Sequence, residues 1–206
     1  GKLFNHRQNL ALVTLVEKTK QVLETNRLSL NDGGLLIALV TCLALAIDRS
    51  ADYWSSLAVW AGDFVAHTFG RQALGIVWDY AEVNGFSNGS GSYMGAIDWI
   101  SRCIDREVES FSPIGQIEKA SASEHPLSDD SVHAFVTDPP YYDAVPYADL
   151  SDFFYVWLKR SIGPLYKDLF SEDLSPKKGE VVQLSERNPK YAYKTQTYFE
   201  NLMRKS

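Results

Sequence analysis

Four consecutive residues, Asp138-Pro139-Pro140-Tyr141, place a carboxylate, two rigid peptide units and an aromatic ring side by side. The six residues before them, 132–137, form a short apolar run, which predicts a buried strand. The residues from Asp149 to Arg160 have helical periodicity. In open α/β sheets, ligands bind at the carboxyl ends of the strands. The order of strand, Asp-Pro-Pro-Tyr and helix therefore predicts a ligand site at the edge of a sheet.

These residues resemble the catalytic motif of amino-group DNA methyltransferases, which use S-adenosylmethionine. The longer string TDPPYYDAVPYADLSDFFYVWLKR, residues 137–160, is similar to one subgroup, the adenine-specific DNA methylases of the DUF1156 type. Weaker similarities to this subgroup are LALAIDRSADYWSSL (43–57), TFGRQAL (68–74), VWDYAEVN (77–84) and PLSDDSV (126–132). The resemblance covers most of the chain. It implies an α/β fold, with a partial Rossmann-like methyltransferase sheet after a helical N-terminal region.

Methyl transfer to an exocyclic amine is the chemistry that the resemblance implies. Such an amine is a weak nucleophile because its lone pair is delocalised into the ring. Asp138 would accept one amine proton with its carboxylate and Pro139 the other with its carbonyl, while Pro140 helps to hold that carbonyl in place. The Tyr141 ring would stack on a base flipped out of duplex DNA. Adenine N6 is the expected acceptor.

Further roles follow from the same resemblance. Substrate contacts are expected from Tyr142, Asp143 and Tyr147. Cofactor contacts are expected from Asp138, Ser121 and Ala122, although the family often has an acidic residue where Ser121-Ala122 stands. The implied partner is DNA, the implied cofactor is S-adenosylmethionine, and no metal is implied.

One element of the family is missing from the sequence. No glycine-rich loop of the Phe-x-Gly-x-Gly kind follows a predicted strand, and in the family this loop binds the methionine part of the cofactor. We therefore expect the protein to extend beyond both ends of this chain, with the flanking parts as partners. The isolated chain is expected to bind the cofactor weakly and to be inactive.

Other hypotheses stay open. Asp-Pro-Pro is common turn chemistry and Tyr141 could pack in a core, so the tetrapeptide alone does not decide between a turn and a site. Related motifs methylate amines or amides of RNA and protein. A third hypothesis is a nucleic-acid-binding module that does not catalyse a reaction.

Charge is distributed unevenly along the chain, whose net charge is -6. Residues 1–157 hold ten basic and twenty acidic residues, a balance of -10, and residues 158–206 hold ten and six, a balance of +4. A basic segment is what binding to a phosphate backbone requires, although a solvated surface explains it equally well.

Two cysteines and four histidines are too few and too scattered for a zinc site, so Cys42 and Cys103 are expected as reduced, buried thiols in a cytoplasmic protein. The apolar run from Leu35 to Ile47 has 13 residues. A membrane span needs about 20, so a buried helix is expected here and no membrane partner.

Periodicity predicts helices over residues 7–24, 35–57, 93–108 and 149–160, and strands over 114–118 and 132–136. Residues 73–83 fit either type. Asp149 and Ser151 are expected as helix N-caps. The composition changes near Phe111, which divides the chain into a mostly helical region, 1–110, and a partial catalytic domain, 111–206.

Residues 84–92 are the only glycine-rich stretch. Their order is not that of a dinucleotide-binding loop, so a flexible connection is favoured over a cradle for phosphate or cofactor.

Overall fold

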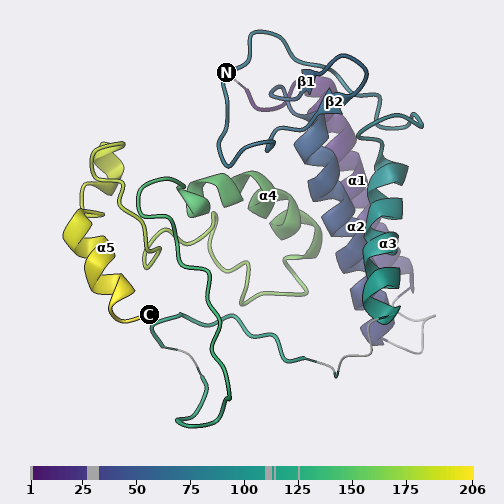
Figure 1. Ribbon diagram of the computed structural model, residues 1–206. Coiled ribbons are helices and arrows are strands. Elements are labelled where there is room, and N and C mark those ends of the chain that lie inside the picture. Colours follow the sequence, from purple (N-terminus) through teal and green to yellow (C-terminus); the bar gives the residue numbers. More distant parts are fainter. Residues whose placement is uncertain (1, 27–32, 110–112, 114, 125) are drawn as a thin grey trace. The chain divides into compact units, whose positions relative to one another are not determined.

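The computed structural model describes residues 2–26, 33–109, 113, 115–124 and 126–206 (Figure 1). The α-helices are α1 (His6–Asn26), α2 (Gly33–Trp54), α3 (Tyr93–Glu109), α4 (Tyr147–Ile162) and α5 (Gln196–Met203), with a 3-10 helix at Pro189–Tyr191. Two short strands, β1 (Val59–Trp60) and β2 (Val65–Ala66), pair antiparallel. The described part of the chain is therefore mostly helical.

The chain divides into two compact units. The first unit comprises Gly1–Phe111 and Leu150–Ser175, and the second comprises Ser112–Asp149 and Pro176–Ser206. Most of α4 thus belongs with the N-terminal helices, whereas the sequence assigned it to the C-terminal region. The reason is packing, because Phe153 and Trp157 of α4 are buried in the core of the first unit.

The core of the first unit is built from helix faces that the periodicity predicted. Leu12 and Val16 of α1 pack with Ile47, Ala51 and Trp54 of α2 in one buried cluster. A second cluster joins three residues of α2 to the end of α4 (Leu36, Val40, Ala44 and Ile162). The four helices predicted from spacing are confirmed, with ends shifted by up to three residues.

Helix α2 is the one helix in the described residues that is long and apolar enough to cross a membrane by length and composition. Its buried face packs in the core, and it contacts both α1 and α3. Leu35 and Leu39 on another face are exposed. The burial that the sequence predicted for this helix therefore holds for one face only.

The predicted α/β sheet is wrong. Residues 132–136 form no strand, and Phe135 and Val136 are 60% and 91% exposed. Residues 115–118 form no strand either, while Ile114 lies outside the described residues. A strand needs a neighbouring strand for its hydrogen bonds and a packed face for its side chains. The only sheet in the described chain is the β1–β2 pair, so these apolar runs have neither.

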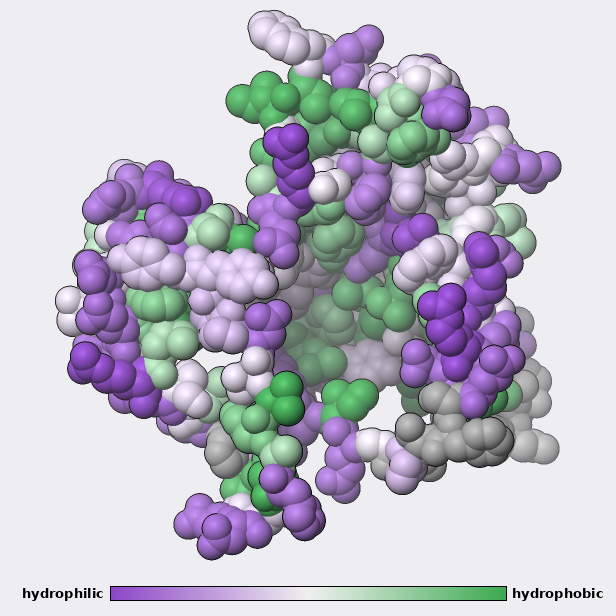
Figure 2. All heavy atoms as spheres, in the orientation of Figure 1, coloured by the Kyte–Doolittle hydropathy of each residue, from purple (hydrophilic) through white to green (hydrophobic). Residues whose placement is uncertain are grey.

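Large apolar side chains accordingly remain at the surface. Figure 2 shows apolar side chains, in green, among the polar ones on the visible face. Exposed residues of this kind occur in both units, and they include Trp78, Ile117 and Phe135.

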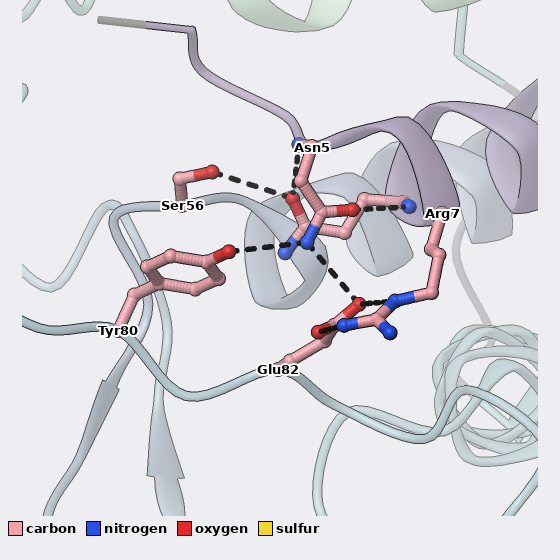
Figure 3. A network of polar contacts seen from close by, with 6 residues as sticks. Asn5, Arg7, Ser56, Tyr80 and Glu82 are labelled. Atoms are coloured by element: carbon pink, nitrogen blue, oxygen red, sulfur yellow. Dashed lines mark hydrogen bonds and ion pairs between the residues drawn. The ribbon is translucent and has the colours of Figure 1, made fainter.

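A polar network at the start of α1 fixes the segment that periodicity left ambiguous (Figure 3). Asn5 and Gln8 form a capping box, in which each backbone N–H donates to the other side chain at 2.7 and 2.9 Å. Arg7 donates to both carboxylate oxygens of Glu82, at 2.9 and 2.5 Å. The bound Arg7 guanidinium holds the pKa of Glu82 below its usual value. Residues 73–83 are thus neither helix nor regular strand, but are anchored through Glu82.

Candidate functional site

The Asp-Pro-Pro-Tyr loop, residues 138–141, lies in the second unit without regular secondary structure. Asp138 and Pro139 are exposed, and no group in the described residues donates a hydrogen bond to the Asp138 carboxylate or the Pro139 carbonyl. The Tyr141 side chain is 53% exposed, which excludes the alternative of a core tyrosine. The two acceptors and the ring are therefore open to a ligand.

Tyr142 attaches this loop to the C-terminal segment. Its carbonyl accepts a hydrogen bond from Gln183 N at 3.0 Å, and its ring packs edge-on against Phe199 of α5, with centroids 4.9 Å apart. Tyr142 has a φ of 48°, in the left-handed region that non-glycine residues seldom occupy. The neighbouring turn is closed by Ala144 N, which donates to Tyr141 O at 2.8 Å. These contacts hold Tyr142 in place directly after the exposed Tyr141.

Asp143 faces Arg187 at 3.7 Å, and the Arg187 guanidinium also donates to Ala144 O at 3.5 Å. Both side chains are about half exposed, so solvent screens the pair and it contributes little to stability. Asp143 is therefore oriented by Arg187, yet it stays accessible.

The start of α4 is held by a charge pair whose lysine is fully buried. Glu180 accepts a hydrogen bond from Ala148 N at 2.8 Å, so its carboxylate satisfies a donor in the first turn of the helix. Its other oxygen accepts from Lys194 Nζ at 2.5 Å. Lys194 is 0% exposed and lies 5.0 Å from the centroid of the Tyr191 ring. This pair holds the residues that follow the Asp-Pro-Pro-Tyr loop to the C-terminal segment of the second unit.

Asp149 belongs to the same network. The Tyr191 hydroxyl donates to Asp149 Oδ1 at 2.6 Å, and burial together with this carboxylate raises the pKa of Tyr191. Helix α4 begins at Tyr147, so Asp149 and Ser151 lie inside the helix and the prediction that they are N-caps is wrong. Tyr147 is half-buried in the first turn.

The residues expected to contact the cofactor are not joined to the loop. Ser121 forms an isolated bridge with Glu124, and its hydroxyl lies 2.9 Å from that of Ser123. Ser121 and Ala122 are exposed, and within the described residues no hydrogen bond connects them to Asp138. They offer one hydroxyl and no carboxylate. The structure therefore does not bring Ser121 and Ala122 together with Asp138 into one site.

Sequence reasoning missed the residues that support the loop, namely Glu180, Gln183, Lys194 and Phe199. Each is separated from its partner by more than ten positions, so no local spacing marks them. In the part of the chain that the structure describes, no cluster of three or more histidine, cysteine or acidic side chains could hold a metal.

No family model, curated protein or solved structure matches this chain. The resemblance to the amino-group methyltransferases therefore rests on the sequence strings alone.

Proposed function

We propose that this chain provides the methyl-acceptor side of a DNA methyltransferase that acts on an exocyclic amine, adenine N6 in the first place. The observation that carries the proposal is the Asp138-to-Tyr141 loop, whose carboxylate, Pro139 carbonyl and aromatic ring are open at the surface. S-adenosylmethionine would be the methyl donor.

The proposed role of the loop is to prepare the amine. The Asp138 carboxylate and the Pro139 carbonyl each accept one amine hydrogen bond, which turns the nitrogen lone pair toward the incoming methyl group. S-adenosylmethionine, when bound, would supply the methyl group, and Asp138 would take the proton that the methylated nitrogen loses. Positioning supplies most of the rate, so no strong base is required.

Tyr141 receives the flipped base in this proposal. Flipping costs a few kcal/mol, and a base stacked on an aromatic ring recovers about 1–3 kcal/mol. The exposed ring next to the anchored Tyr142 supports this role, because the anchor restricts the backbone that carries the ring.

Basic residues of the same unit support DNA as the partner. In residues 176–206, seven lysines and arginines stand against three glutamates. The exposed ones are Lys178, Arg187, Lys190, Arg204 and Lys205. Cations of this kind neutralise phosphates and make binding depend on salt.

The proposal can be tested by fluorescence with duplex DNA that carries 2-aminopurine opposite a mismatch. Binding of the chain should first raise the emission as the base leaves the stack, and stacking on Tyr141 should then quench it. Tyr141→Ala should remove the quenching. Asp138→Ala should reduce the preference for a target base that carries an exocyclic amine over one that lacks it. Tyr193→Ala, which removes another exposed tyrosine of the unit, is the matched control.

Three outcomes would contradict the proposal. Equal emission for the wild type and Tyr141→Ala would show that the ring receives no base. If DNA affinity falls only when the basic residues are mutated, the chain is better described as a nucleic-acid-binding module that does not catalyse a reaction. If the chain binds single-stranded RNA more tightly than duplex DNA, RNA replaces DNA as the proposed substrate.

A further inference from the structure

A cavity of about 230 Å³ lies in the first unit between α2, the glycine-rich loop and α3. Helix α2 contributes Arg49, Ser50 and Tyr53 to its wall, and α3 contributes Trp99 and Arg102. Residues 89–92 close another side. Two guanidinium groups from two different helices therefore line one small cavity, which the proposed function does not use.

Arg49 is held in place without a carboxylate partner. Its guanidinium carbon lies 4.4 Å from the centroid of the Trp99 ring and 5.6 Å from that of Tyr53. No acidic group of the described residues forms an ion pair with it, whereas Arg102 pairs with Asp98 at 2.7 Å. Aromatic contacts occupy the faces of a guanidinium and leave the N–H donors at its edge. Arg49 thus presents a fixed, uncompensated cation to the cavity.

The glycine-rich loop is packed, in contrast to the flexible connection favoured from its composition. Trp54 Nε1 donates to Gly91 O at 2.7 Å, and Tyr93 N donates to Gly85 O at 2.8 Å. Gly91 has a φ of 78°, and a Cβ there would lie 2.8 Å from the Tyr53 side chain. Only glycine fits this position. The loop therefore forms a fixed wall of the cavity.

Hydroxyl groups complete the lining. Ser50 and Ser92 are buried and Ser90 is exposed, and all three line the cavity. The Ser50 hydroxyl already donates to Ala46 O at 2.8 Å, so Ser90 and Ser92 supply the hydroxyl donors for a ligand. A tetrahedral phosphate has three or four oxygens, which the guanidinium groups and these two hydroxyls can satisfy together. A planar carboxylate has only two oxygens and would use fewer of these donors.

We propose that this cavity binds a phosphate group, with Arg49 as the principal cation. The phosphate belongs either to a free mononucleotide or to a nucleic-acid backbone, and the chemistry of recognition is the same for both. This proposal is independent of the Asp138-to-Tyr141 loop, because the residues that line the cavity all lie in the first unit and the loop lies in the second.

The test uses three probes with the 206-residue chain: inorganic phosphate, AMP and a fluorescein-labelled 12-nucleotide oligothymidylate. Phosphate and AMP are titrated by calorimetry, and the oligonucleotide is followed by anisotropy at several salt concentrations. Arg49→Met, which keeps an unbranched apolar stem and removes the guanidinium, should weaken phosphate and AMP binding by about tenfold or more, because a charge-assisted hydrogen bond is lost. Arg49→Lys should restore part of the affinity. Arg106→Met removes an exposed arginine of α3 outside the cavity and should bind as the wild type does.

The oligonucleotide distinguishes the two sources of phosphate. If the site takes a backbone phosphate, Arg49→Met should reduce the slope of log K against log salt by about 0.7, the value for one contact to a single strand. An unchanged slope together with weakened AMP binding assigns the site to a mononucleotide.

The proposal is overturned if the Arg49→Met variant binds all three probes as tightly as the wild type does. It is also overturned if acetate competes for the site as well as phosphate does. Thermal melting checks that the variants fold. If Arg49→Met does not fold, Arg102→Met tests the same cavity while leaving the Arg49 ring contacts in place.

Discussion

Asp48 offers the sharpest test of the physical account of this fold. It lies on α2 with 8% of its surface exposed, and its Oδ1 has no hydrogen-bond partner in the described residues. Burial disfavours the charged form and raises the pKa of Asp48 from 3.8 to about 8. The folded protein therefore keeps a proton at neutral pH that the unfolded chain releases.

The sign of the pH dependence follows from this shift. Because the pKa of Asp48 is higher in the folded state, protonation of Asp48 favours the folded state. This contribution to the free energy of unfolding is fully present below pH 4 and is lost as the pH rises through about 8. Each pH unit within this window changes the free energy of unfolding by about 1.4 kcal/mol. Stability should therefore fall by roughly 2–3 kcal/mol between pH 5 and pH 7 through this one group.

Asp48→Asn removes the titration and keeps the shape of the side chain. We expect it to raise the free energy of unfolding by about 2–4 kcal/mol at pH 7, with a smaller gain at pH 5, since a buried amide also lacks a partner. Urea unfolding followed by circular dichroism at pH 5, 6, 7 and 8 measures both quantities. Asp63→Asn, at an exposed aspartate, controls for the change in net charge.

Two results would refute the reasoning. One is a wild-type stability that stays level or rises between pH 5 and pH 8. The other is an Asp48→Asn variant whose stability depends on pH as steeply as that of the wild type.

Three further predictions concern the second unit and the cofactor. Tyr141→Ala should change the free energy of unfolding by less than about 0.5 kcal/mol, because the ring is largely exposed; a large fall in melting temperature would contradict this. Lys194→Met should destabilise the protein by about 3–5 kcal/mol in urea unfolding, because Glu180 loses its partner inside the unit, and the double variant with Glu180→Gln should recover part of the loss. No recovery would show that the lysine matters for packing alone. Calorimetry with S-adenosylmethionine should find no micromolar affinity for this chain, because the sequence lacks a glycine-rich loop of the kind that holds the cofactor; a micromolar Kd would place a cofactor site among these residues.

The sequence predicted four of the five α-helices because their signal is local, and it missed α5. In α1, α2, α3 and α4 the apolar residues recur at helical spacing, and the structure buries Phe153 and Trp157 on the apolar face of α4. The capping box Asn5-x-x-Gln8 was also readable from its spacing, although it was missed. The resemblance of residues 137–160 likewise comes from contiguous residues.

Tertiary structure decided what depends on distant partners. The apolar run at 132–136 has the composition of a strand, but a strand forms only where another strand pairs with it, and in the described chain none does. Glu180 and Lys194 meet across 14 positions, and Arg49 of α2 meets Trp99 of α3 across a loop. Spacing along a chain carries no information on such contacts, because they arise only when separate elements pack. The sequence by itself therefore determined the helices and the candidate loop, and the tertiary structure determined what supports that loop and which cations face a cavity.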